Sequence, residues 1–356
     1  MSGKGRSLSE LQKVKDDFLT SCKALGHSEE LSKEVYRQIE SFAGYSFCKA
    51  HSASYAVESY QSLYLKVYYP IEFMVAVINN QGGFYRTEVY VHEAKMSGAK
   101  INNPCVNRSL YTTTLYGNEV YLGFMHLEKL DAKTAQIIAI ERQRNGDYTS
   151  LENFLKRIPI GIETLQILIF IGAFRIFGKA KYELLIEARF LVSDTKYKAR
   201  NLTLIEEPLH EYSLPKMERH WLEDGFDELE ILGFTVSCTP FDLLQTQFRG
   251  KVTAKTLSRY HRKEVKMVAY LIARKYVPTS KGVMNFGTWI DVEGNYFDTS
   301  HFPDALSQYP FLGNGCYLLL GVVDVDFNFP TLTVHKMARL PYIEDPRYNV
   351  IAKKHE

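Results

Sequence analysis

The chain has 356 residues, of which 46% are hydrophobic and 24% charged, and its formal net charge is +2. That length suits about two or three domains of ordinary soluble composition. The longest apolar run, 165–174, is too short to cross a bilayer, and the polar first residues are not those of a secretory signal. We therefore expect a cytoplasmic protein without a membrane segment. Five scattered cysteines with no CxxC pair predict neither a disulfide framework nor a zinc site.

The first elements in chain order are helical. The apolar spacing predicts helices over 8–22 and 29–41, with Ser28 as the N-cap of the second. In the stretch 42–79 the apolar residues recur at helical spacing and predict one buried stripe. The stripe consists of Ala53, Ala56, Val57, Tyr60, Leu63 and Tyr64.

The opposite face of that helix is polar, with Ser52, Tyr55, Ser59, Ser62 and Lys66. Lys49 and His51 stand at the helix entrance, where the helix dipole favours an anion such as phosphate. Pro70 restarts a helix in the first-turn position that proline prefers. An ordinary amphipathic surface helix is the alternative interpretation of this pattern.

The middle of the chain alternates short helices with one hairpin. A helix over 85–96 is closed by Gly98, and a β-hairpin is predicted around the pair 117–118. Further helices are expected over 130–144, 151–158, 162–171 and 182–192.

Charge then separates along the sequence. Nine acidic residues lie between Glu206 and Glu230 against Lys216 and Arg219, which predicts a solvated acidic surface or linker. From Arg249 onward the balance inverts, with ten basic residues and one acid up to residue 281. Short strands follow and predict a small barrel. They cover 265–273, 283–291, 316–325 and 331–337.

Three motifs resemble those of one family. The stretch 42–79 reads FAGYSFCKAHSASYA and then YQSLYLKVYYPIEFM. It resembles the fingers region of the C family of bacterial replicative polymerases, the alpha subunit of DNA polymerase III, which reads approximately FAGYGFNKSHAAAYA, YQ and LKxxYPxEFM. Cys48 stands where that family usually has Asn. The segments 104–109 and 232–242 resemble the family's PxxNRS and LGFxxSxxPxD motifs.

The resemblance implies an α+β, multidomain chain. Its expected parts are a fingers-like helical segment (1–110), a tandem helix-hairpin-helix region (111–200), an acidic linker and junction (201–248), an oligonucleotide-binding (OB)-like barrel (249–342) and a tail (343–356). The family's palm, thumb and phosphoesterase-like domain would lie upstream of residue 1. We therefore expect no catalytic residue, metal site or cofactor in this chain, while Mg²⁺ is expected for the complete polymerase.

The resemblance also suggests binding residues. In the fingers, Lys49, His51, Tyr55 and Gln61 would face the incoming nucleotide. Helix-hairpin-helix motifs approach duplex phosphates through glycines, but here the expected glycines fall on Lys129 and Asp131, and an aspartate would repel phosphate.

OB folds take single strands on basic and aromatic side chains. The candidates are Arg274, Tyr276, Lys281, Phe286 and Trp289. The alternative is that Phe286 and Trp289 belong to the barrel core. The family's clamp-binding peptide has no counterpart at 201–205, NLTLI, so we expect weak or no binding to the sliding clamp.

The pair Asp324 and Asp326 resembles the paired aspartates of a polymerase palm, but residues 322–327 alternate as a strand that runs into the turn at 328–330. We therefore predict no Mg²⁺ site there.

Three functions remain open. The first is part of a replicative DNA polymerase III alpha subunit, which would bind template-primer and single-stranded DNA together with the remaining polymerase portion or other replisome subunits. The second is a stand-alone, non-catalytic nucleic-acid-binding protein derived from it, and the third is a replisome scaffold. An open frame encoding a palm upstream of the Met1 codon would distinguish them.

Overall fold

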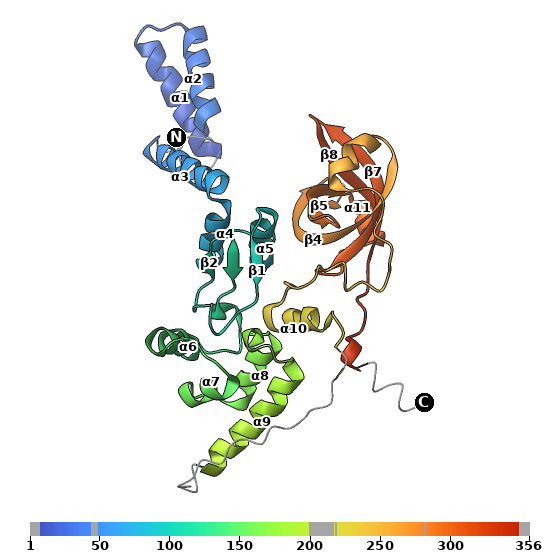
Figure 1. The fold of residues 1–356 in the computed structure, drawn as a ribbon. Coiled ribbons are helices and arrows are strands. Elements are labelled where there is room, and N and C mark those ends of the chain that lie inside the picture. Colours follow the sequence, from blue (N-terminus) through green and yellow to red (C-terminus); the bar gives the residue numbers. More distant parts are fainter. Residues whose placement is uncertain (1–7, 44–48, 199–216, 218, 281, 349–356) are drawn as a thin grey trace. The chain divides into compact units, whose positions relative to one another are not determined.

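The computed structural model describes residues 8–43, 49–198, 217, 219–280 and 282–348 (Figure 1). The chain divides into two compact units, Met1–Tyr69 and Pro70–Glu356. None of the helices in the described ranges is long and apolar enough to pass through a membrane.

The described part of the first unit contains three helices, α1 (Leu8–Ala24), α2 (Glu29–Ala43) and α3 (Lys49–Tyr68). The rings of Phe18 and Tyr36 lie 5.5 Å apart between α1 and α2, and Tyr36 is buried. The Ser28 hydroxyl accepts a hydrogen bond from the backbone N–H of Leu31 at 3.3 Å, which confirms the predicted N-cap.

The predicted buried stripe of α3 is wrong for this structure. Residues 50–68 are exposed, among them Val57 at 56%, Tyr60 at 72% and Leu63 at 62%. Helical spacing identifies a face that is suited to burial, but it does not supply the element that would cover that face.

The second unit begins with α4 (Pro70–Asn79), as Pro70 predicts, and α5 (Thr87–Met96). The three-stranded sheet that follows has the order β1-β3-β2, from β1 (Lys100–Asn102), β2 (Thr114–Tyr116) and β3 (Glu119–Tyr121). Strands β2 and β3 form the predicted hairpin, whereas the parallel pairing of β1 with β3 was not anticipated. Met74, Ala94 and Val120 share a small core between α4, α5 and the sheet.

The helix-hairpin-helix region has one core of its own. Its elements are η1 (Phe124–His126), α6 (Ala132–Asn145), α7 (Leu151–Arg157), α8 (Ile162–Phe170), η2 (Arg175–Phe177) and α9 (Lys181–Lys198). Phe154 is fully buried and meets Tyr148 and Phe174 edge-on, with ring centroids 4.9 Å away in both pairs. The family-like motif at 104–109 is built into this core, because the Arg142 guanidinium donates to the carbonyls of Val106 and Ser109.

The C-terminal part of the acidic segment differs from its prediction as a solvated surface or linker, while residues 206–216 and 218 lie outside the described residues. It contains α10 (Glu223–Leu232), in which Asp227 and Glu228 are buried. The carboxylate of Asp227 pairs with Arg347 at 2.7 Å and with Lys181. These cations lie far away in the sequence, and this is why local charge counting missed the burial.

Glu228 fixes the junction motif at 232–242. Its Oε2 accepts hydrogen bonds from the backbone N–H groups of Val236 and Ser237, at 2.7 and 2.8 Å. Asn103 donates to its other carboxylate oxygen. The motif therefore has a structural role: it ties the loop after α10 to the sheet region.

The C-terminal barrel is closed, with the strand order β4-β5-β6-β8-β7. Its elements are η3 (Ala254–Tyr260), β4 (Glu264–Thr279), β5 (Gly282–Asp291), β6 (Tyr296–His301), α11 (Pro303–Gln308), β7 (Cys316–Asp326) and β8 (Phe329–Arg339). The sequence predicted the other four strands but neither β6 nor α11. A five-stranded barrel after a helical helix-hairpin-helix region is the predicted fold class, which is thus confirmed.

Candidate nucleic-acid interface

The hairpin of β4 and β5 carries the predicted DNA-binding residues. A bulge at Ile272 shifts the register, so that Arg274 pairs with Gly287 and Tyr276 pairs with Asn285. The Arg274 guanidinium lies 5.1 Å from the centre of the Tyr276 ring, and Tyr276 is 55% exposed. A cation and an exposed aromatic ring are therefore side by side, as single-strand binding requires.

Phe286 lies on the other face of this hairpin. It is 42% exposed and pairs with Lys275, whose side chain points away from those of its two neighbours in the strand. The described candidates on this hairpin therefore form two cation–aromatic pairs on opposite faces. They do not make up one continuous surface.

Trp289 is not at the surface, which corrects its assignment as a DNA-binding residue. Its side chain is fully buried, and the indole N–H donates to Thr299 Oγ1 at 2.7 Å. It stacks on Phe311 at 5.9 Å and meets Tyr317 edge-on at 5.4 Å. Alternation in β5 explains the outcome, because Trp289 and Gly287 share the inward side whereas Phe286 faces outward.

Most of the basic run is exposed around the barrel. Arg249 is an exception, because its guanidinium donates to the carbonyl of Phe241 at 2.7 Å. The described, exposed cations are Lys251, Lys255, Arg259, Arg262, Lys263, Lys266, Arg274 and Lys275. Lys281 lies outside the described residues, as do residues 201–205, where a clamp peptide would be expected.

Sequence reasoning missed Phe327. It lies in the two-residue turn between β7 and β8, where Asp326 pairs with Phe329. The turn needs positive φ at both positions, and Phe327 has φ 47° and Asn328 has φ 66°. Phe327 is 97% exposed, and a bulky residue in this conformation is uncommon. The sequence signal for this turn was the pair Phe-Asn at a place where two-residue hairpin turns usually have Asn-Gly.

The first helix-hairpin-helix turn is closed by its own side chain. Asp131 is the N-cap of α6, and its carboxylate accepts a hydrogen bond from the backbone N–H of Thr134 at 2.8 Å. Hydrogen bonds from the Thr134 side chain and, second, from its backbone N–H lower the pKa of Asp131. An ionised carboxylate therefore accepts the hydrogen bond of the N–H group that a phosphate would otherwise approach.

The fingers residues are brought together only in part. The rings of His51 and Tyr55 lie 4.5 Å apart, edge to face, on the exposed α3. Gln61 is exposed ten residues beyond His51, roughly 80° around the helix from it. Lys49 begins the helix, but its side chain lies outside the described residues.

The candidate metal pair is at the end of a strand, as predicted. Asp324 and Asp326 are exposed near the end of β7, beside the turn that holds Phe327. The Asp324 carboxylate lies 3.9 Å from Nδ1 of His261.

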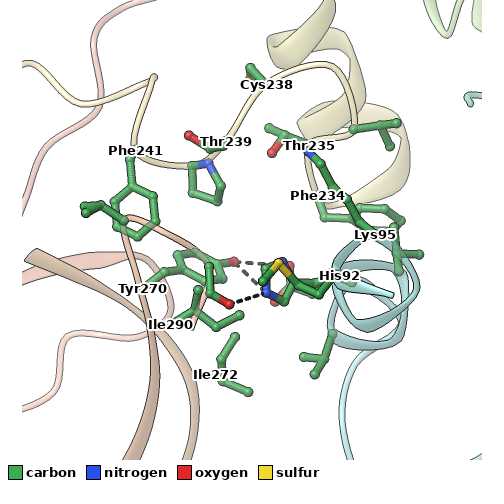
Figure 2. Close-up of a pocket in the computed structure, with 18 of the residues that line it drawn as sticks. His92, Lys95, Phe234, Thr235, Cys238, Thr239, Phe241, Tyr270, Ile272 and Ile290 are labelled. Carbon is green, nitrogen blue, oxygen red and sulfur yellow. Dashed lines mark hydrogen bonds between the residues drawn. The ribbon is translucent and has the colours of Figure 1, made fainter. Parts of the chain in front are cut away.

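A pocket of about 210 Å³ lies where α5, the junction loop and the barrel meet (Figure 2). Its walls are mostly apolar, with Phe234, Phe241 and Ile290 among them. The Tyr270 hydroxyl donates to the Glu88 carboxylate at 3.1 Å, and His92 Nε2 donates to the carbonyl of Gly294 at 2.8 Å. These contacts hold α5 against the outer face of β4 and β5.

Burial affects the ionisation of this seam. Glu88 forms an ion pair with Arg86, yet desolvation dominates and raises the pKa of Glu88. Burial likewise raises the pKa of Tyr270 and, to about 12, that of the nearby Cys238 thiol. A protonated thiol is a poor nucleophile, so the pocket is suited to packing rather than to covalent chemistry.

Comparison with known proteins identifies relatives of this architecture. Residues 98–184 match the helix-hairpin-helix motif family. DNA polymerase III subunit alpha of Thermus aquaticus is 34% identical over 180 residues, which are 49% of this chain and 15% of that protein. The same subunit of Treponema pallidum is 29% identical over 360 residues, 94% of this chain and 30% of that protein. The chain thus spans less than a third of either relative.

Among solved structures, the second OB-fold domain of replication protein A from Methanococcus maripaludis is similar to part of the chain. The match covers 24% of this chain and 88% of that domain, at 13% sequence identity and with a TM-score of 0.17.

Proposed function

The chain is homologous to the C-terminal part of the alpha subunit of DNA polymerase III, and we propose that it supplies DNA-binding functions of such a replicative polymerase. Helix-hairpin-helix and OB-like regions both suggest nucleic-acid binding. The observation that carries the proposal furthest is the exposed Arg274–Tyr276 pair within a run of exposed cations on the barrel.

The proposed ligand of the barrel is single-stranded DNA. Exposed rings at Tyr276, Phe286 and Phe327 offer stacking surfaces that any base can use. Neighbouring cations neutralise phosphates and release counterions, so the affinity should fall steeply with salt. Loops between strands 1 and 2 and between strands 4 and 5 of an OB fold commonly bind oligonucleotides, and Phe327 lies in the second of these loops.

The test is fluorescence anisotropy with a labelled oligo(dT) and the whole chain at several salt concentrations. We expect binding whose logarithm falls linearly with the logarithm of salt concentration. Absence of binding at low salt, or binding that does not depend on salt, would contradict the proposal.

We propose that α3 faces the incoming nucleotide in the complete polymerase. Lys49 would neutralise charge on the triphosphate, His51 and Tyr55 would lie close by, and Gln61 would contribute from the next face of the helix. The palm carboxylates and their Mg²⁺ would come from the remaining portion of the polymerase.

Primer extension tests this division of labour. We expect residues 1–356 to extend no primer with Mg²⁺ and all four nucleotides, and we expect extension when a palm-bearing partner polypeptide is added. In that pair Lys49→Ala should reduce extension more than the matched change Lys66→Ala. Extension by the chain alone, lost in Asp324→Asn, would show that the aspartate pair on β7 is catalytic. Unchanged activity of Lys49→Ala would remove the phosphate role from α3.

Clamp binding through residues 196–210 is not part of the proposed function. Residues 201–205, where the clamp motif would fall, have neither the glutamine nor the aromatic anchor that would fill a clamp pocket. Submicromolar binding of this peptide to the cognate clamp would contradict this view.

A further inference from the structure

A buried amide in the barrel lacks a hydrogen bond. Asn285 is 4% exposed, and its Oδ1 finds no donor among the described residues. Buried polar atoms are nearly always paired, and an unpaired one costs about 1–3 kcal/mol. An unpaired acceptor in a strand that carries binding residues therefore suggests a partner that comes from outside the protein.

The surroundings of Asn285 form the mouth of the barrel, which we define as Arg274, Tyr276, Asn285, His301 and Phe311. Asn285 pairs in register with Tyr276 on one side and with His301 on the other, so the three side chains share one face. Phe311 closes the cluster from the segment after α11, with its ring 4.8 Å from that of His301.

Arg274 lies across this mouth. Its guanidinium is 5.1 Å from the Tyr276 ring and 5.5 Å from the Phe311 ring. A planar cation held by two aromatic rings occupies the kind of space that a planar base would take. Because Arg274 is exposed, it can swing out to pair with a phosphate when a base enters.

We propose that the barrel mouth is a subsite for one nucleobase that carries an exocyclic amino group. The base displaces the Arg274 guanidinium, stacks on Tyr276 and Phe311, and donates its amino hydrogen to Asn285 Oδ1. Cytosine, adenine and guanine carry such a donor, whereas thymine presents a carbonyl oxygen at the position of the cytosine amino group. This inference rests on the proposed single-strand binding and adds a base preference to it.

Cytosine and thymine make the sharpest comparison, because both are pyrimidines and stack alike. One neutral hydrogen bond to an otherwise unpaired acceptor favours oligo(dC) over oligo(dT) of equal length by about 2- to 10-fold. The measurement is fluorescence anisotropy with the full chain at one fixed salt concentration. Asn285→Ala should bring the ratio close to one, while the matched surface change Asn118→Ala should preserve it.

A ligand change keeps the test informative if Asn285→Ala fails to fold, which circular dichroism would reveal. An oligonucleotide of pyrimidin-2-one, which is cytosine without its amino group, should bind the unaltered chain no better than oligo(dT). Failure to bind any of the strands would overturn the proposed function itself. Binding with equal affinities, a preference for thymine, or a preference that survives loss of either the amide or the amino group would overturn this inference alone.

Discussion

Replacement of Trp289 should damage the barrel before it affects DNA binding. The indole is fully buried, packs against Phe311 and Tyr317, and donates to Thr299. Truncation of a buried tryptophan to alanine costs about 3–5 kcal/mol through lost burial and the cavity that remains. The lost hydrogen bond adds at most about 1 kcal/mol, because the Thr299 hydroxyl still contacts His301 at 2.7 Å.

We therefore expect Trp289→Ala to lose most of the barrel's stability, and Trp289→Phe to lose about 1–3 kcal/mol because an aromatic ring remains. The assay is urea unfolding of the full chain followed by circular dichroism, since Trp289 is one of only two tryptophans and its removal alters the fluorescence signal. The matched control is Trp221→Phe, because Trp221 is 62% exposed and should be nearly neutral. An unchanged unfolding midpoint of Trp289→Ala together with a tenfold loss of single-strand affinity would refute the core assignment.

Three further results are expected. Tyr276→Ala should keep the unfolding midpoint but weaken oligo(dT) binding by about 1–3 kcal/mol in anisotropy. The control Tyr116→Ala, at a tyrosine that is 47% exposed against 55% for Tyr276, should leave binding unchanged, and equal losses in both variants would contradict a stacking role. Asp131→Ala should destabilise α6 by about 0.5–2 kcal/mol in thermal unfolding, because the N-cap hydrogen bond is lost. Asp131→Gly should increase duplex binding in gel shifts, because it frees the Thr134 N–H, and no gain in binding would mean that this turn does not face DNA. Burial lowers the pKa of His301 to about 4, so the unfolded chain takes up the proton first as pH falls below about 6.5, and the free energy of unfolding should fall by up to ~3 kcal/mol between pH 6.5 and 4. His301→Gln should remove that part of the pH dependence, and an unfolding free energy with the same pH dependence in this variant would contradict the prediction.

The sequence predicted best where local pattern and burial agree. The α6–α9 helices and four barrel strands follow apolar periodicity bounded by glycine or proline, so their existence could be read directly. Strand β6 was missed because most of its residues, YFDTSH, are polar. Polar side chains among them become buried only when the strand pairs with β5 and β8. Such burial depends on cross-strand partners that local sequence does not contain.

Charge and aromatic content were less informative about individual side chains. The sequence predicts Asp227 and Glu228 as solvated acids, yet both are buried. Asp227 pairs with cations more than 40 residues away, and Glu228 accepts hydrogen bonds from loop N–H groups. Trp289 and Phe286 are three residues apart and chemically similar, and only the register of β5 decides which is core. Asn285 and Phe327 gave no strong sequence signal, because an orphan acceptor and a positive φ are properties of the fold.

The two predicted DNA-binding regions differ in what they leave available to a phosphate. At the first helix-hairpin-helix turn, the Asp131 carboxylate takes the N–H group and places negative charge at the helix start. At the barrel, eight described cations of the basic run 249–281 are exposed, and Arg274 is held by aromatic rings instead of a carboxylate. Because counterion release scales with the phosphates neutralised, most of the salt-dependent affinity should come from the barrel. Single strands, whose bases are free to stack, should therefore bind this chain more tightly than duplex of the same length.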